Sequence, residues 1–190
     1  MTKDEKIAKL GKEITDRATV LLGKDKITPD APEYLGINSA LKFTAVKYDE
    51  KMADDILDIA LTMKKRVPLT IEQLAKKNPQ FDRAYLEKAL QALSESGLVE
   101  FHWENLDGKN PNHEKRWVLD MFVPGSAEIM MINPEQADMF PETADFFERM
   151  AYLPLAGITE MVPPGGAGIG MHVIPVEKAI PAESKSLPIE

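Results

Sequence analysis

The segment from Thr70 to Gly97 constrains the fold of this chain most, because it holds two helix starts and two helix ends. Positions 70–73, Thr-Ile-Glu-Gln, form a capping box, in which a hydroxyl and a side-chain amide satisfy backbone N–H groups at a helix start. A short helix over Ile71–Lys77 is predicted to end at the Asn-Pro pair that follows it. Asp82 then caps a second helix, which Gly97 ends in the left-handed backbone conformation.

The elements around this helix pair extend the pattern. A longer helix is predicted before it, over Asp49–Lys65, and Val67–Leu69 is predicted as a short strand-like link. Two β-rich runs follow, Leu98–Trp103 and Arg116–Phe122, joined by a polar loop. The second helix of the pair carries apolar residues at helical spacing, namely Leu86, Ala89, Leu90 and Leu93. This order predicts a winged helix-turn-helix, a scaffold that binds DNA in many proteins.

The N-terminal region is predicted to add one amphipathic helix to this scaffold. Asp4–Leu22 carries a single apolar stripe, consisting of Ile7, Leu10, Ile14, Ala18 and Leu21. Lys24–Phe43 contains two prolines and a glycine and is interpreted as a connecting loop. The first part of the chain, residues 1–46, is therefore expected to be a helix and a loop, ahead of a winged-helix domain at 47–123.

Residues 124–190 are predicted to form a C-terminal helix and strand extension that leads to a downstream domain. Ser126–Ile132 fits either a strand or a helix entry, and Pro134–Tyr152 is helical in pattern. A glycine-rich loop at 163–170 precedes a strand-like run, Met171–Val176. The expected fold class is thus α+β and mostly helical.

Composition narrows the possible functions. The chain of 190 residues has no cysteine, which excludes disulfides, thiolate zinc sites, iron–sulfur ligands and cysteine nucleophiles from the chain itself. No apolar run reaches the length of about 20 residues that crosses a bilayer, and the N-terminus lacks a signal-peptide core. A cytoplasmic location without membrane contact is expected. The formal net charge of −8 opposes nonspecific attraction to nucleic acid.

DNA binding is the alternative that the scaffold itself suggests. Its contacts would come from the second helix and the wing, through Arg83, Lys88, Gln91, Lys115 and Arg116. Residues 48–123, however, hold 11 lysines and arginines against 14 acidic residues. A protein that neutralises several phosphates concentrates its cations on one face. Nucleic-acid binding is therefore kept only as the second interpretation.

The glycine-rich loop is the candidate for a small-molecule site, because closely spaced glycines let backbone N–H groups approach a phosphate. Its glycines are Gly165, Gly166, Gly168 and Gly170. Their spacing matches neither the dinucleotide fingerprint nor the P-loop motif, and a strand, not a helix, is predicted after them. A turn between packed elements is the favoured interpretation, with nucleotide or flavin contact as the alternative.

Metal-binding and catalytic patterns are not evident. His102, His113 and His172 are scattered along the chain, and none forms a metal-binding pair at helical spacing. Acidic residues such as Asp54 and Asp58 fall on the outer face of a predicted helix, where carboxylates are usually solvated. No metal site and no catalytic residue is expected.

The glycine-rich run leading into His172–Lys178, downstream of a winged helix, resembles the N-terminal region of certain bacterial and archaeal iron–sulfur proteins. In that family a winged-helix-like segment precedes 4Fe-4S ferredoxin-type domains, sometimes fused to a flavin and pyridine-nucleotide oxidoreductase. The resemblance implies that the 4Fe-4S clusters, and a flavin where one is present, are bound by sequence after Glu190. This chain departs from the cluster-binding pattern, since it has no cysteine and thus no cofactor of its own.

The resulting expectation is a non-catalytic winged-helix module that docks or regulates an iron–sulfur electron-transfer oxidoreductase. Its partner would be another protein or the downstream redox domain, which suits an acidic surface. The N-terminal stripe of Ile7, Leu10 and Ile14 would pack on the winged helix or on a second copy in a homodimer. A winged-helix transcriptional regulator is the alternative.

Overall fold

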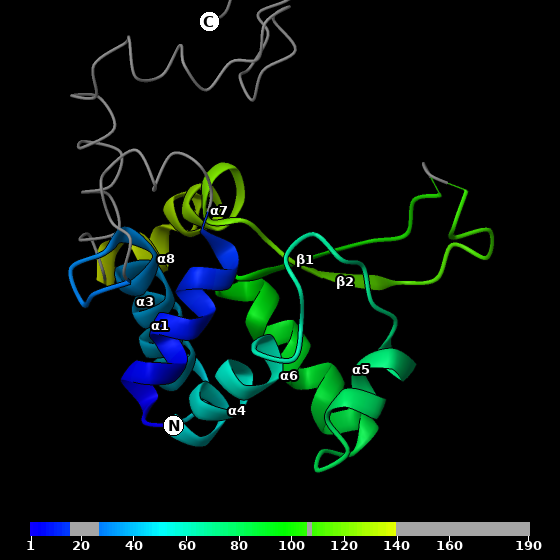
Figure 1. Cartoon of the computed structure of the whole chain (residues 1–190), viewed down its shortest axis with the longest axis horizontal. Coiled ribbons are helices and arrows are strands. Elements are labelled where there is room, and N and C mark those ends of the chain that lie inside the picture. Colours follow the sequence, from blue (N-terminus) through cyan, green and yellow to red (C-terminus); the bar gives the residue numbers. More distant parts are fainter. Residues whose placement is uncertain (16–26, 106–107, 140–190) are drawn as a thin grey trace, which may run out of the picture. The chain divides into compact units, whose positions relative to one another are not determined.

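The computed structural model of the protein describes residues 1–15, 27–105 and 108–139 (Figure 1). These residues all belong to one compact unit, Met1–Leu153. A second unit, Pro154–Glu190, lies outside the described residues. The described part is mostly helical and has one small antiparallel sheet of two strands, so the prediction of a mostly helical α+β fold is confirmed at that level. The division of the sequence at residues 46 and 123 stays a prediction.

Four helices build the core: α1 (Lys3–Ile14), α3 (Pro32–Lys47), α4 (Glu50–Ala60) and α6 (Arg83–Glu95). Helix α3 packs on both α1 and α4, and α4 packs on α6. In Figure 1, α1, α3 and α4 lie together on one side of α6. The helices meet through aliphatic side chains that are at most 2% exposed, among them Ile7, Leu10, Ile37, Met52, Ile56, Leu86 and Leu90. Burial of this apolar surface is the main force that holds the unit together.

Helix α3 corrects the predicted loop over Lys24–Phe43. Pro32 does not break this helix because it occupies the first turn, where its missing N–H costs nothing. Ten of the 16 residues of α3 are buried, so the helix is covered on several sides and shows no amphipathic stripe. Gly36 lets α3 approach a neighbouring ring, since a Cβ built there would lie 2.6 Å from Phe122 Cε2. Tertiary contacts therefore stabilise this helix, and it cannot be recognised from an amphipathic pattern in the sequence.

Helix α1 is shorter than predicted. It begins with a capping box between Thr2 and Glu5 and ends at Ile14, whereas residues 16–26 lie outside the described part. Ile7, Leu10 and Ile14 are at most 1% exposed and pack within the chain on α3 and α4. Their apolar surface is therefore already covered inside one copy, and the homodimer stays a prediction without support from these three side chains.

The helix pair follows the predicted signals closely. Helix α5 (Ile71–Lys77) starts with the expected capping box: Thr70 Oγ1 accepts from the Gln73 N–H, and the Thr70 N–H donates to Gln73 Oε1 at 2.9 Å. Asn78 ends α5 while buried, and its side chain donates to the Leu74 carbonyl oxygen at 3.0 Å. Asp82 caps α6 through the Tyr85 N–H. Gly97 has φ +81° after α6, as predicted.

The predicted helix before the pair is also found, although it ends earlier than expected. Asp49 is the N-cap of α4, accepting from the Met52 N–H at 2.7 Å. The helix stops at Ala60 and not at Lys65, because the Thr62 hydroxyl and N–H both bond back to the Ile59 carbonyl oxygen. Such local bonds offer the backbone an alternative to helix continuation.

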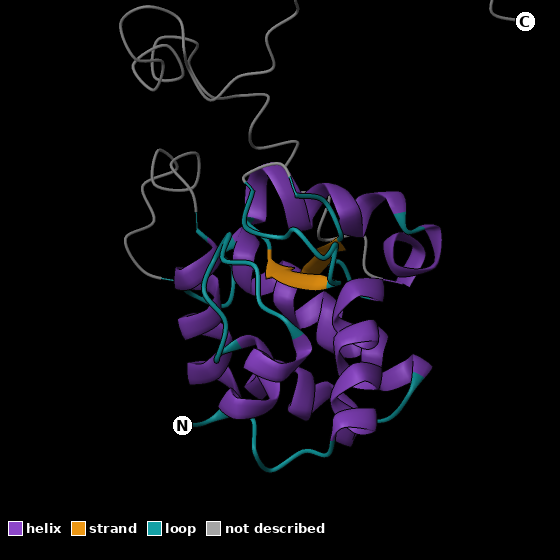
Figure 2. Ribbon diagram, turned by 90° about the vertical axis from the view of Figure 1, so that its right-hand side faces the viewer, coloured by secondary structure: helices purple, strands orange, loops and turns teal. Residues whose placement is uncertain are grey.

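The sheet consists of β1 (Val99–His102) and β2 (Arg116–Leu119), paired from Val99↔Leu119 to His102↔Arg116. Figure 2 shows this two-stranded sheet lying against the helices. On its other side β2 meets the strand-like link, where Leu69 and Trp117 exchange two backbone hydrogen bonds of 2.9 Å. The predicted link thus forms a single antiparallel bridge.

The chain after β2 turns back into the core. The prediction of a strand up to Phe122 is wrong, because a π-helical turn, η1 (Phe122–Ser126), starts there and the Phe122 ring is fully buried. Helices α7 (Ala127–Ile132) and α8 (Pro134–Met139) follow, so the segment at 126–132 is a helix and not a strand. The rest of the helical prediction, residues 140–152, lies outside the described part.

Candidate functional site

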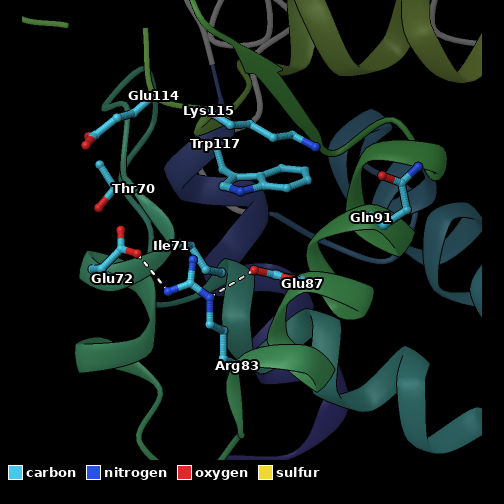
Figure 3. Close-up of a pocket in the computed structure, with 9 residues that line it drawn as sticks. All are labelled: Thr70, Ile71, Glu72, Arg83, Glu87, Gln91, Glu114, Lys115 and Trp117. Carbon is cyan, nitrogen blue, oxygen red and sulfur yellow. Dashed lines mark hydrogen bonds and ion pairs between the residues drawn. The ribbon is translucent and has the colours of Figure 1, made fainter. Parts of the chain in front are cut away.

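A hollow of about 520 Å³ lies between α5, α6 and the β1–β2 hairpin. Figure 3 shows its lining, which comes from all three elements. The lining residues are Thr70, Ile71, Glu72, Arg83, Glu87, Gln91, Glu114, Lys115 and Trp117. Three of the five side chains predicted for the DNA alternative, Arg83, Gln91 and Lys115, are brought together here. We call this space the α5–α6 hollow.

Arg83 is held by carboxylates on both sides. Its Nη1 lies 2.8 Å from Glu72 Oε1, on α5, and its Nε lies 3.1 Å from Glu87 Oε1, one turn along α6. Bonds to Glu72 and then Glu87 raise the pKa of Arg83. The pKa of Glu72 is lowered, first by its own backbone N–H and then by Arg83. Two of the five N–H donors of the guanidinium are thus bonded to carboxylates of the chain, while the side chain is 61% exposed.

Lys115 lies on an aromatic wall. Its Nζ is 3.9 Å from the centroid of the Phe101 ring and 4.1 Å from that of Trp117. The Phe101 ring meets Trp103 and Trp117 edge to face, with centroids 5.3 Å and 5.2 Å apart. A cation over ring faces gains attraction from the ring quadrupoles, about 0.5–1 kcal/mol at exposed sites. This contact tethers the ammonium group to the hairpin.

The other two predicted DNA contacts, Lys88 and Arg116, lie outside the hollow, and Gln91 bonds along its own helix. The Lys88 Nζ lies 5.6 Å from the ring centroid of Tyr48, whose pKa is raised to about 12 by burial and then by its bond to Glu95. The Gln91 Nε2 donates to Glu95 Oε1 at 3.2 Å, and Arg116 Nη2 donates to the backbone carbonyl of Lys109. Neither Lys88 nor Arg116 lines the α5–α6 hollow.

The charge of the hollow is slightly negative. Its lining has three carboxylates, Glu72, Glu87 and Glu114, against the cations Arg83 and Lys115. Glu114 is exposed, and within the described ranges its carboxylate has no bonded partner. A polyanion approaching this space would therefore meet one carboxylate, Glu114, that no cation of the lining pairs with.

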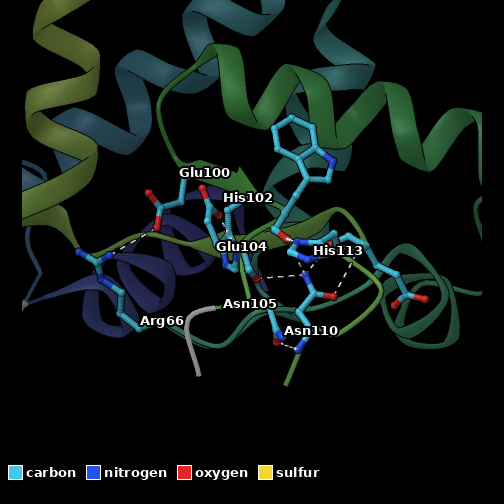
Figure 4. Close-up of polar contacts among 9 residues, drawn as sticks. Arg66, Glu100, His102, Glu104, Asn105, Asn110 and His113 are labelled. Carbon is cyan, nitrogen blue, oxygen red and sulfur yellow. Dashed lines mark hydrogen bonds and ion pairs between the residues drawn. The ribbon is translucent and has the colours of Figure 1, made fainter. Parts of the chain in front are cut away.

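The loop that joins β1 and β2, residues 103–115, is organised around Asn110 (Figure 4). This side chain is 1% exposed, and its Nδ2 donates to the carbonyl oxygens of Trp103, Glu104 and Glu114 at 2.9–3.2 Å. Its Oδ1 accepts from the Glu114 N–H at 3.0 Å, and its own N–H donates to Asn105 Oδ1. One buried amide thus links both sides of the loop.

The same loop presents an exposed tryptophan. Trp103 is 49% exposed, and with Glu104, Asn105 and His113 it lines a second, shallower hollow of about 580 Å³. His113 has φ +50°, and its Nδ1 lies 3.0 Å from the Trp103 carbonyl oxygen. Sequence reasoning missed Asn110 and Trp103, although an asparagine in a polar hairpin loop is a recognised turn signal.

The two histidines in the described residues, His102 and His113, have different contacts. His102 Nδ1 lies 3.2 Å from Glu104 Oε2, while His113 bonds to backbone. Residues 1–15, 27–105 and 108–139 contain no group of three or more His, Cys, Asp or Glu side chains arranged to hold a metal ion. His172 and the glycines Gly165, Gly166, Gly168 and Gly170 lie outside the described residues.

A buried carboxylate lies behind the hairpin, at the end of β2. Asp120 is 2% exposed and 3.3 Å from Arg66 Nη2, while Arg66 Nη1 also lies 3.4 Å from Glu100 Oε1. Burial raises the pKa of Asp120 to about 6, with Glu100 adding to the effect and Arg66 opposing it. Gly125, at φ +152°, keeps the space open, since a Cβ there would lie 2.8 Å from Asp120 Cγ. The sequence pattern contains no signal for this site.

Comparison of the chain with known proteins does not assign it to a family. Neither protein-family models nor curated proteins nor solved structures match this chain. Within the described part, no helix has the length and apolar character needed to span a bilayer.

Proposed function

We propose that α4, α5, α6 and the β1–β2 hairpin form a winged helix-turn-helix whose DNA-reading surface has become a protein-docking surface. The element order supports the fold assignment, as does the Leu69–Trp117 bridge, which adds the short third strand of a winged helix. In this reading α6 is the second helix of the turn unit and residues 103–115 are the wing.

The engagement of the cations carries the functional proposal. Arg83 is shared between two carboxylates, Lys115 lies on aromatic rings, and Arg116 bonds to a backbone carbonyl. A DNA-binding surface needs cationic donors that are free to neutralise phosphates, and a typical site contacts about six or more phosphates. Here a phosphate approaching Arg83 would compete with Glu72 and Glu87, which already offset the charge of the guanidinium and would repel the phosphate. Protein docking does not carry this electrostatic cost.

The redox part of the proposal comes from the family resemblance of the glycine-rich run and His172–Lys178. In that reading the module docks an iron–sulfur electron-transfer oxidoreductase to its partner, and the 4Fe-4S clusters are bound by sequence after Glu190. The chain itself then binds no iron–sulfur cluster, since it offers no thiolate ligand, and its role in this proposal is a non-catalytic one. A CxxC-rich coding sequence after Glu190 would support this reading, whereas a stop codon at that point would contradict it.

A duplex-binding measurement tests the docking proposal against the regulator. Fluorescence anisotropy with labelled duplexes at low and moderate salt is expected to give no saturable binding by the wild-type chain up to about 100 µM. The double variant Glu72→Gln, Glu87→Gln releases Arg83 and is expected to gain weak binding that falls steeply with salt. Sequence-specific binding by the wild-type chain, lost in Arg83→Ala, would establish the regulator instead.

Electron-transfer rates test the docking role in the polypeptide that carries the clusters. Trp103→Ala is expected to slow electron transfer to the protein partner, while iron content and reduction of a small viologen dye stay unchanged. Val46→Ala is the control, because Val46 is also apolar and exposed (69%) but lies on α3. Equal rates for wild type and Trp103→Ala with the protein partner would refute docking through the wing.

A further inference from the structure

The structure points to a cationic peptide segment as the occupant of the α5–α6 hollow: we infer that it binds a short stretch of alternating basic and apolar residues in a protein partner. This inference rests on the proposed docking function and names the chemistry of the partner. It draws on three features of the hollow, namely an acidic rim, an aromatic wall and an ordered loop.

The acidic rim lies on one side of the hollow. Figure 3 shows the side chains of Glu114 and Glu72 on the same side, flanking Thr70. Glu72 shares Arg83 with Glu87, whereas Glu114 has no bonded side-chain partner in the described part of the chain. An arginine or lysine from a partner would find an unpaired carboxylate here, and an acidic segment would be repelled.

The lining of the hollow also offers apolar surface. Ile71 and Trp117 are its apolar members. Lys115 Nζ lies 3.9 Å from the Phe101 centroid, so the aromatic faces beside the hollow already hold a cation of this chain. A basic residue of the partner is therefore directed to Glu114 on the rim, and its apolar residues to Ile71 and Trp117. The exposed Trp103 extends the aromatic wall outward, 5.3 Å from Phe101 by ring centroids. Tryptophan and arginine contacts of this kind dominate binding energy at protein interfaces.

In the chain alone, Asn110 holds the described residues on the two sides of the loop, 103–105 and 108–115, together. Asn110 bonds to the carbonyl oxygens of Trp103 and Glu114, at 3.2 Å and 2.9 Å. A pre-organised loop loses little conformational entropy on binding, so more of the contact energy appears as affinity. The hollow is therefore shaped to receive a segment without refolding.

The test uses the only two tryptophans of the chain: Trp117 lines the hollow, and Trp103 lies on the same hairpin. Tryptophan emission of the full chain is titrated with three capped hexapeptides in which leucine alternates with arginine, glutamine or glutamate. The arginine peptide is expected to shift the emission and to bind at least tenfold more tightly than the other two. Its affinity should fall as salt rises from low to high concentration, because the rim charges are exposed.

Two variants with the same charge change locate the binding. Glu114→Gln is expected to weaken the arginine peptide about three- to fivefold, a range typical of an exposed ion pair. Glu135→Gln, on the exposed surface of α8, is the matched control and should leave the affinity unchanged. Thermal unfolding of both variants verifies that each is folded.

Several outcomes would overturn the inference: equal binding of the glutamine and arginine peptides, equal loss in both variants, or no emission change with any peptide. These results are distinct from a failure of the proposed function, which would appear as specific duplex binding by the wild-type chain. Absence of both DNA and peptide binding would leave protein docking in place but exclude a basic segment as the occupant.

Discussion

The helical core and the hairpin loop of this protein are ordered by different kinds of interaction. In the core, α1, α3, α4 and α6 bury aliphatic side chains that no single hydrogen bond positions. In the loop, residues 103–115, one buried asparagine makes directed bonds to backbone groups on both sides. Apolar burial is non-directional and tolerates small shifts, whereas an amide network holds one backbone geometry. The loop is therefore suited to present Trp103 and Glu114 at fixed positions, and the core supplies the free energy of folding.

The largest effect is expected from the core. Leu90→Ala should lower the free energy of unfolding by about 2–5 kcal/mol, because Leu90 is fully buried on α6 and its loss leaves a cavity. Urea unfolding measures the change. Lys88→Ala, on the exposed side of the same helix, is the control and should cost less than about 1 kcal/mol. Equal losses in both variants would contradict the assignment of α6 to the core.

Asp120, at the boundary between the two regions, is expected to make stability depend on pH. Its pKa of about 6 in the folded chain exceeds the ordinary value of 3.8, so the folded state holds the proton more tightly than the unfolded state. Stability from this group is therefore highest near pH 4 and falls as pH rises through 6. At pH 7, Asp120→Asn should stabilise the fold by about 1–3 kcal/mol.

The advantage of Asp120→Asn should shrink as the pH is lowered from 7 towards 4, since the wild-type carboxyl then becomes protonated as well. Urea unfolding at several pH values checks this trend. Asp138→Asn, an exposed carboxylate on α8, is the control and should show no such pH-dependent gain. A constant difference between Asp120→Asn and wild type at all pH values would argue against titration of Asp120.

The hairpin loop should respond locally to loss of its amide. Asn110→Ala is expected to cost about 1–2 kcal/mol, because loop carbonyls that lose the amide regain bonds to water. Hydrogen exchange should accelerate at residues 103–116 and stay unchanged in α4. Asn112→Ala, an exposed asparagine of the same loop, is the control. Faster hydrogen exchange in the helices of the core as well would show that Asn110 stabilises the whole unit and not only the loop.

The smallest effect is expected at the start of α5. Thr70→Ala removes the hydroxyl that accepts from the Gln73 N–H and should cost about 1 kcal/mol. Gln73→Ala removes only the reciprocal bond to the Thr70 N–H, which is exposed, and should cost less. Urea unfolding curves of the two variants rank these contributions. A larger loss of stability in Gln73→Ala than in Thr70→Ala would show that the reciprocal bond, and not the hydroxyl, is the more important part of the cap.

The elements that could be predicted are those with local signals. The helix pair at 71–95, its caps at Thr70 and Asp82 and the turn at Gly97 depend on side chains that bond to backbone within a few residues. The runs that form β1 and β2 are recognisable from their β-branched and aromatic residues. Boundaries shifted where a tertiary contact intervened, as at Phe122, whose ring enters the core and ends the strand pattern.

For the candidate site, the sequence predicts some of the residues but not the contacts that they make. Arg83, Gln91 and Lys115 are among the five residues that the sequence offers for DNA contact, but two of their partners come from other elements: Glu72 lies on α5 and Phe101 on β1. Whether a cation is free or paired depends on distances across the fold, and sequence spacing does not encode these. Net charge alone indicated that the face opposes a polyanion.

By itself the amino-acid sequence determined the mostly helical class, the helix pair and its caps, because these follow from bonding between near neighbours. Only the tertiary structure decided that residues 32–47 are a buried helix, that Asp120 is enclosed and that the cations of the hollow are engaged. The physical reason is that burial and charge pairing join residues far apart in the chain, so their energies exist only once the fold has brought them together.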